Sequence, residues 1–194
     1  MFSWRNLFLW RKVDNFSRKI IHILSAIIIL FFPYFLSLEL IIFVCLLFSF
    51  LFALARFFDF LPIINKVRRL SLGEVFYPLG IMISAIFFLP DDILAFQFGV
   101  LVLGFSDALA NIFGGLFGTY KIKIFGGAKS LEGSLVFLLT TIILSIFFKG
   151  DFALLNFDKY FIVALILTLL EFSLFFGLDN LFLPFISAYL FSLL

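Results

Sequence analysis

The sequence predicts an all-α fold, a polytopic bundle of about six or seven transmembrane helices with its N-terminus in the cytoplasm. Of the 194 residues, 64% are hydrophobic and only 13% are charged, which is too little polar surface for a soluble domain of this size. The apolar residues form continuous runs of Ile, Leu and Phe, without the alternation that marks the strands of a membrane barrel. No polar stretch is long enough for a second unit, so residues 1–194 are expected to form a single domain.

Seven apolar runs are candidate membrane helices, because a span needs about 20 largely apolar residues. They cover residues 20–36, 38–55, 75–89, 93–113, 131–148, 160–176 and 181–194. The last run is short for a span and is expected to be tilted or partly re-entrant. The first run follows basic residues but ends in Pro33 and Tyr34 instead of small residues, so we expect no signal-peptide cleavage.

Residues 1–17 form an N-terminal segment ahead of the bundle, which we place at residues 18–194. The segment combines Trp4 and Trp10 with arginines, a composition that suits a helix lying in the membrane interface.

The basic residues favour one orientation. With the N-terminus inside, only Lys149 and Lys159 of the 14 Lys and Arg residues fall in outer segments, an asymmetry that is typical of cytoplasmic loops. We therefore expect an integral protein of the bacterial cytoplasmic (inner) membrane, with its functional residues at the cytoplasmic face. A net charge of +2 gives no reason to expect a nucleic-acid partner, and the sequence specifies no oligomeric state.

The first helix begins with a polar face. His22 is four residues from Arg18 and three from Lys19, so the three side chains can lie together. Either the two basic residues anchor the helix at the membrane surface and the histidine makes its hydrogen bonds within the protein, or the three residues form part of a site that neutralises phosphate. Glu74, at the start of the third helix, is favoured there by the helix dipole; a cap and a ligand are its two interpretations.

Asp107 is the strongest single candidate for a functional residue. It lies about two turns inside the predicted end of the fourth helix, with Asn111 four residues later on the same face. An ionised aspartate at this depth is costly unless it is paired or bound to a metal, so we favour a functional role. Gly114, Gly115 and Gly118 follow, and they permit close approach of the backbone either to a ligand or to another helix.

The loop after this helix combines lysine, glycine and one carboxylate. Its relevant residues are Lys121, Lys123, Gly126, Gly127, Lys129, Ser130 and Glu132. Lysines and glycines before a helix N-terminus suit anion binding, although a solvated basic loop has the same composition and the spacing is not that of a Walker A loop. Because Glu132 would repel a phosphate, the mixture indicates a metal–nucleotide site.

Glu171 lies inside the sixth helix and needs a partner there, whereas Asp179 and Asn180 at its inner end would alone make an ordinary turn. Carboxylates do not follow the positive-inside rule, so their concentration on the inner face needs another explanation. Phosphoryl transfer provides one, since it uses cations around phosphates, carboxylates around Mg²⁺ and a group that orients the acceptor hydroxyl. An acceptor embedded in lipid would explain why the site sits in a membrane bundle.

Five blocks of the sequence resemble, in order, the motifs of the CTP-dependent polyprenol kinases, the group that includes dolichol kinase and phytol kinase. They are residues 18–25, 73–78, 105–118, 127–134 and 171–184. The chain also shares some character with membrane phosphatidate cytidylyltransferases. The resemblance implies transfer of the CTP γ-phosphate to an isoprenoid or other lipid alcohol of polyprenol, dolichol or phytol type, with Mg²⁺.

The resemblance also suggests roles for the candidate residues. Asp107 would bind metal or act as a base, and Glu132 and Asp179 would help to hold the metal. The groups expected to contact the nucleotide phosphates are Arg18, Lys19, Lys121, Lys123, Lys129, Gly126, Gly127 and Ser130. His22 and Lys129 are counted among the catalytic candidates, and Glu74, Asn111, Glu171 and Asn180 are expected to support the site.

Three other functions were weighed against the kinase. A phosphatidate cytidylyltransferase, which makes CDP-diacylglycerol and releases pyrophosphate, is the main alternative. A small ion-coupled transporter fits less well, because the polar residues gather at one face and the sequence shows no inverted repeat of broken helices. A non-enzymatic scaffold leaves the carboxylates unexplained.

Overall fold

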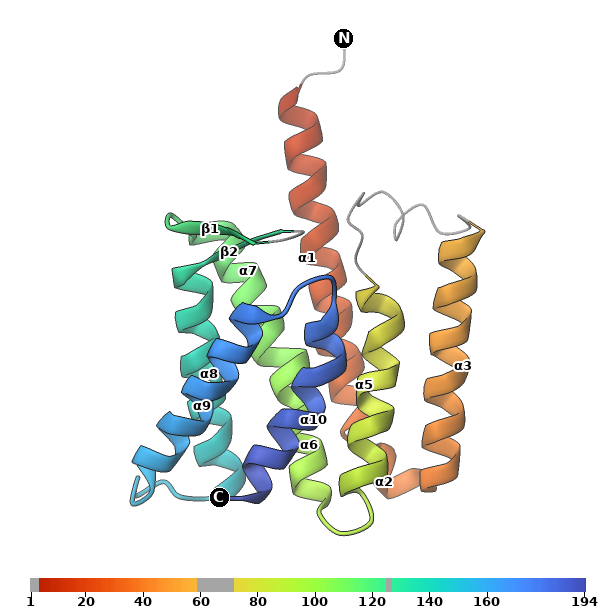
Figure 1. Ribbon diagram of the computed structural model, residues 1–194, viewed down its shortest axis with the longest axis vertical. Coiled ribbons are helices and arrows are strands. Elements are labelled where there is room, and N and C mark those ends of the chain that lie inside the picture. The colour runs from red at the N-terminus through yellow and green to blue at the C-terminus, as the bar shows by residue number, and fades with distance from the viewer. Residues whose placement is uncertain (1–3, 59–71, 125–126) are drawn as a thin grey trace.

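The computed structural model describes residues 4–58, 72–124 and 127–194, in which helices run up and down between two ends of a bundle (Figure 1). The helices are α1 (Trp4–Ile29), α2 (Phe32–Phe35), α3 (Leu38–Phe57), α5 (Gly73–Phe88), α6 (Ile93–Leu101), α7 (Asp107–Phe117), α8 (Leu131–Lys149), α9 (Phe157–Ser173) and α10 (Leu178–Ser192). The π-helical segment η1 (Val102–Ser106) joins α6 to α7 in one continuous pass. A hairpin of β1 (Lys121–Ile124) and β2 (Gly127–Ser130) precedes α8. Every predicted apolar run falls on helices, which confirms the all-α class.

Four helical segments of the described chain are long and apolar enough to cross a membrane. They are Phe16–Phe35, Leu38–Phe57, Ile93–Phe117 and Leu131–Lys149, and α5 and α10 are shorter apolar helices. Large apolar side chains such as Ile21, Phe43 and Ile143 are exposed on the outside of the bundle, as expected where lipid is the solvent. The number of spans and the orientation of the N-terminus stay predictions.

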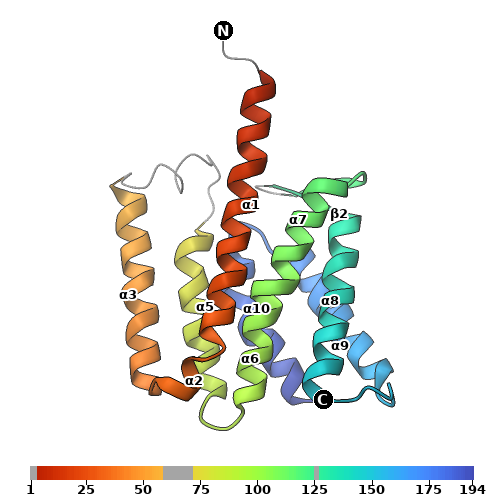
Figure 2. The same cartoon turned by 180° about the vertical axis from the view of Figure 1, so that it is seen from behind.

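The first helix differs from the predicted run at both ends. It begins at Trp4 and continues unbroken into the bundle, with its N-terminal part extending beyond the other helices (Figures 1 and 2). The interfacial position of residues 1–17 stays a prediction. The helix stops at Ile29, four residues before Pro33. Proline has no N–H to donate to the Ile29 carbonyl, and its ring would clash with that carbonyl if the helix continued. The remainder of the predicted run forms α2.

The π-helical segment η1 lies directly before Asp107. Segments of this kind are rare, and they occur often at functional sites. The first helix packs closely on η1, since a Cβ atom added to Gly104 would lie only 2.1 Å from the Cβ of Ala26. This contact sets the depth at which the polar residues of α1 face Asp107.

Aromatic side chains fill the end of the bundle opposite the hairpin. The rings of Phe98 and Phe191 are stacked with their centroids 4.5 Å apart, and Phe148 meets both edge-on. Such packing adds specific ring contacts to the apolar area that is buried. One end of the bundle is thus an apolar core, and the polar residues lie at the other end.

Candidate functional site

The candidate residues belong to helix segments in the half of the bundle that carries the hairpin (Figure 1). The N-terminal ends of α5, α8 and α10 lie here, together with the C-terminal ends of α7 and α9 and the middle of α1. Helix N-terminal ends present free backbone N–H groups and a partial positive charge to this region. The fold therefore brings together segments that are far apart in the sequence.

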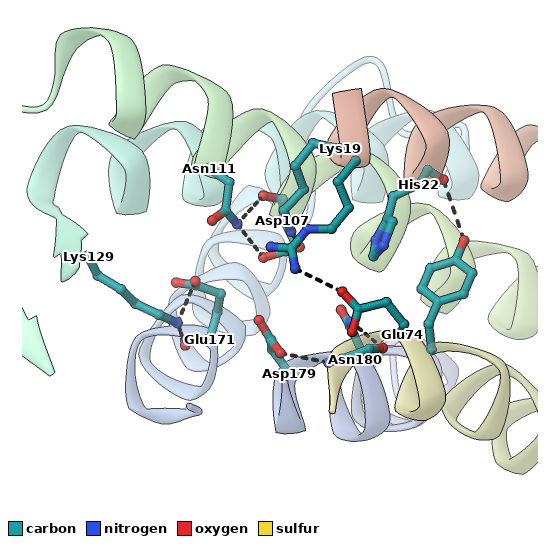
Figure 3. Close-up of polar contacts among 12 residues, drawn as sticks. Lys19, His22, Glu74, Asp107, Asn111, Lys129, Glu171, Asp179 and Asn180 are labelled. Carbon is teal, nitrogen blue, oxygen red and sulfur yellow. Dashed lines mark hydrogen bonds and ion pairs between the residues drawn. The ribbon is translucent and has the colours of Figure 1, made fainter. Parts of the chain in front are cut away.

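Asp107 is fully buried and is the centre of the site (Figure 3). Its Oδ2 forms an ion pair with the Nζ of Lys19, whose residue is only 6% exposed. Its Oδ1 accepts a hydrogen bond from Asn111 Nδ2 at 2.8 Å, and the same Nδ2 also donates to the Asp107 carbonyl. The pairing meets the requirement that a carboxylate at this depth must have a partner. Lys19 is thus a buried partner of Asp107, not an anchor at the membrane surface.

Two further ion pairs connect helices around this centre. Lys129 of β2 reaches the end of α9, where its Nζ lies 2.6 Å from Oε1 of Glu171 and also donates to the Glu171 carbonyl. Arg18 of α1 lies 3.1 Å from Oε1 of Glu74, at the first turn of α5. The partner that the sequence required for Glu171 is therefore the lysine of the hairpin, and Glu74 links α5 to α1.

Asp179 has no ion-pair partner among the described residues. Its Oδ1 accepts only from the backbone N–H of Asn180, at 3.0 Å, and it lies within electrostatic range of Asp107, Lys19 and Lys129. The side chain of Asn180 donates to the Gly73 carbonyl at 2.8 Å, which fastens α10 to the start of α5. Asn180 therefore links two helices, and Figure 3 shows Asp179 between Glu171 and Asn180, while the role of both residues in the site stays a prediction.

A cavity of about 350 Å³ adjoins the Asp107–Lys19 pair. In the described part of the chain its charged lining consists of Arg18, Lys19, Lys121, Lys129 and Glu171, with polar side chains from Asn111, Ser130 and Ser134. Arg18, Lys19 and Lys129 are paired with carboxylates, whereas Lys121 has no ion-pair partner among the described residues, so an anion in the cavity would meet at least one unpaired cation. The size falls within the range of small-molecule sites, which is about 300–1,000 Å³.

The hairpin forms one wall of this cavity. Lys121 of β1 pairs with Ser130 of β2, and both line the cavity. Ser130 also caps α8, since its Oγ accepts from the backbone N–H of Gly133 at 3.1 Å. Gly126 and the side chain of Lys123 lie outside the described residues, so their predicted contacts with phosphate stay predictions; Gly127 begins β2.

The glycines after Asp107 have two different surroundings. A Cβ atom on Gly114 would lie 2.5 Å from Ser130 Oγ, and one on Gly118 would lie 2.7 Å from Ser130 Cβ, so these two glycines serve helix and hairpin packing. Gly115 lines the cavity, and a Cβ atom there would meet nothing within 4 Å. Gly114 also lines the cavity, so packing is confirmed for Gly114 and Gly118, whereas close approach of this backbone to a ligand stays a prediction.

Glu132 does not join the other carboxylates. Its Oε1 accepts from the backbone N–H and hydroxyl of Thr119 and from the N–H of Tyr120, so it fixes the turn that leads into β1. No three His, Cys, Asp or Glu side chains form a metal-binding group within the described ranges. The predicted ligand set of Asp107, Glu132 and Asp179 is thus not assembled, because the chain between α7 and β1 takes Glu132 as its acceptor.

Sequence reasoning gave no role to the contacts that hold His22. Tyr77 of α5 lies with its ring centroid 4.6 Å from that of His22, and its hydroxyl is 2.8 Å from Ser25 Oγ. Ser25 and Tyr77 both donate to the His22 carbonyl. The spacing of residues 18, 22 and 25 indicated a polar face on α1, but it could not predict that Tyr77 of α5 would contact this face.

The fold and the site define a class, a helical membrane protein with a cation-lined cavity beside buried carboxylates at one end. The chain is 37% identical over 134 residues to an uncharacterised protein of Methanocaldococcus jannaschii, covering 68% of this chain and 64% of that protein. It is 32% identical over 133 residues to phytol kinase of Synechocystis, covering 66% of this chain and 57% of that enzyme. The chain therefore spans less than two thirds of the length of these relatives. No family model and no solved structure matches it.

Proposed function

We propose that this protein is a CTP-dependent kinase that phosphorylates an isoprenoid or other lipid alcohol at the cytoplasmic face of a membrane. The observation that carries the proposal is the cavity lined by four cations directly beside buried Asp107. Similarity to the Synechocystis phytol kinase supports both the reaction and the acceptor class. The choice of CTP rests on the resemblance of the sequence motifs, and the orientation rests on the distribution of basic residues.

The cavity would receive the phosphates of the nucleotide. Lys121 and Lys129 approach it from the hairpin and Arg18 and Lys19 from α1, so cations would lie on two sides of the phosphate chain. Phosphoryl transfer depends mainly on such positioning and charge stabilisation. Entry of phosphates would draw Lys19 away from Asp107 and leave the Oδ2 atom of Asp107 available.

The reaction would then proceed by direct transfer. The oxygen of the alcohol forms a bond to the γ-phosphorus while the bond from that phosphorus to the β–γ bridging oxygen breaks. The products are the phosphorylated alcohol and CDP. The hydroxyl proton passes to Oδ2 of Asp107, whose Oδ1 stays on Asn111.

The site would suit a magnesium ion that is held partly by a protein carboxylate and partly by the phosphates of the nucleotide. Mg²⁺ commonly takes one or two carboxylates together with substrate phosphates and water. Asp179, which has no ion-pair partner in the described chain, is the residue that would hold it, because Asp107 keeps Oδ1 on Asn111 and Oδ2 for the hydroxyl proton. When bound, the ion would supply positive charge against the phosphates. Glu132 is left out of this set because its Oε1 is held by Thr119.

The test uses purified protein in detergent with Mg²⁺, phytol or a lipid extract, and CTP labelled at either the α- or the γ-phosphate. We expect label from the γ-position to enter the lipid and CDP to accumulate. Label that enters only from the α-position, with release of pyrophosphate, would instead identify a cytidylyltransferase. Transfer from neither position to any lipid of the extract would contradict both enzymes and favour transport.

Filling the cavity should weaken nucleotide binding. In Gly115→Leu the new side chain enters the open space at this position, so we expect the apparent affinity for CTP to fall by about tenfold or more. The melting temperature in detergent should change little, since no neighbour lies within 4 Å of the added Cβ. Gly114→Ala is the matched control, and it should lower the melting temperature because its Cβ would collide with Ser130. Unchanged CTP affinity in Gly115→Leu would place the nucleotide elsewhere.

A further inference from the structure

A second group of polar side chains lies away from the cavity, where α1, α5 and α10 meet. We call it the three-helix junction and define it by His22, Glu74 and Asn180, none of which lines the cavity. Figure 3 shows these residues on one side of Asp107, whereas Lys129 is on the other side. The junction and the cavity are thus separate places that share Asp107 as a neighbour.

Two buried polar atoms at the junction have no partner among the described side chains. They are Nδ1 of His22, a residue that is 8% exposed, and Oδ1 of Asn180, which is 6% exposed. Buried polar atoms are nearly always hydrogen-bonded, so two such atoms in one region need an explanation. Neither side chain is free to turn away, because the His22 ring packs on Tyr77 and the Asn180 amide donates to the Gly73 carbonyl.

The chemistry of the two atoms selects the group that would satisfy them. A carbonyl can only accept, so the Asn180 atom that bonds to the Gly73 carbonyl is Nδ2, and Oδ1 is left as an acceptor. A histidine Nδ1 can carry a proton and donate. A hydroxyl group both donates and accepts, so its chemistry suits both an acceptor and a donor. A phosphate oxygen cannot donate to Asn180 and would be repelled by the carboxylates of Glu74 and Asp179.

We propose that the three-helix junction binds the hydroxyl group of the acceptor alcohol before the nucleotide enters. The hydroxyl then donates to Oδ1 of Asn180 and accepts from Nδ1 of His22, and its proton turns to Oδ2 of Asp107 when the phosphates draw Lys19 away. This inference rests on the proposed function and names the residues that hold its acceptor. Since His22 follows Lys19 by one turn of α1, the hydroxyl lies next to Asp107, and the phosphates of the cavity lie on the other side of Lys19. The tail of the alcohol leaves the junction beside Ile21, whose side chain is exposed to the lipid.

Direct binding of tritiated phytol to the purified protein in detergent, without nucleotide, tests the site. Unlabelled phytol and phytyl methyl ether serve as competitors, because the ether keeps the oxygen and loses the donor. We expect the wild-type protein to bind phytol about tenfold more tightly than the ether, because the ether would leave the buried acceptor Oδ1 of Asn180 unpaired. In Asn180→Leu, which removes the acceptor, the preference should fall to about twofold or less, whereas His22→Phe, which keeps a ring against Tyr77, should weaken phytol and the ether equally. His22→Asn should retain the wild-type affinity, since its amide nitrogen can replace Nδ1.

The melting temperature of each variant in detergent shows whether it folds, and Leu24→Ala, on the exposed face of the same helix, is the matched control with an unchanged preference. Equal preference for phytol in wild type and Asn180→Leu would overturn the inference, as would wild-type affinity in His22→Phe or a wild-type protein that does not distinguish the two competitors. Transfer of the γ-label by the wild type is measured separately. A protein that binds phytol as expected but transfers no label would contradict the kinase and support the hydroxyl site.

Discussion

Substitution of Asp107 by asparagine is expected to lower phosphate transfer by about a thousandfold or more. Asparagine has nearly the same shape as aspartate but carries no charge and cannot take up the hydroxyl proton. Its side chain can keep the contact with Asn111, but Lys19 loses its carboxylate, so the melting temperature in detergent is compared with that of the wild type. The measurement is the initial rate of γ-label transfer from CTP to phytol, at saturating concentrations of both substrates.

Asp92→Asn is the matched control for this variant. Asp92 caps α6 by accepting from the backbone N–H of Ala95 at 2.9 Å, and asparagine caps helices equally well. The same chemical change at this position should leave the transfer rate within about twofold of the wild-type rate. Wild-type transfer in Asp107→Asn would remove Asp107 from the reaction and, with it, the proposed mechanism.

The sequence was sufficient to predict the helices of the fold, because membrane helices are specified by long apolar runs. It did not predict the β1–β2 hairpin, which was expected to be a loop, or two breaks in the helices. Pro33 ends α1 four residues earlier in the chain, and η1 replaces α-helical geometry before Asp107. A proline gives a local signal that could have been used, whereas a π-helical segment depends on how α1 packs on Gly104 and has no comparable signature.

The sequence predicted which residues belong to the candidate site better than it predicted which cation pairs with which carboxylate. Burial cost alone pointed to Asp107 and Glu171, since an intramembrane carboxylate must have a partner. Which cation serves each one depends on the third dimension: Lys19 lies on another helix, and Lys129 reaches across from the hairpin. Glu132 was misplaced for the same reason. Its position in the first turn of α8 suited a ligand, but the nearest donors came from the turn before β1.

The ion pair between Lys19 and Asp107 allows the energetic role of this site to be separated from its chemical role. Lys19→Met leaves the carboxylate of Asp107 buried without its cation, and we expect the free energy of unfolding to fall by about 3–5 kcal/mol. The double variant Lys19→Met/Asp107→Asn removes both charges and should recover most of that loss. It should not recover phosphate transfer. Both quantities are measured on the same purified proteins, by reversible denaturation in detergent and by γ-label transfer.

Arg18→Met is the matched comparison, because Arg18 precedes Lys19 on α1 and also forms an ion pair across helices. The side chains of Arg18 and Glu74 are 31% and 16% exposed, so removing this cation should cost only about 1 kcal/mol of unfolding free energy. A Lys19→Met protein as stable as Arg18→Met would mean that Asp107 is not held as a buried ion. A double variant as unstable as Lys19→Met would mean that the loss comes from packing of the lysine stem. Recovery of stability without recovery of transfer is the result expected of a carboxylate that is held in place by Lys19 and used in the reaction.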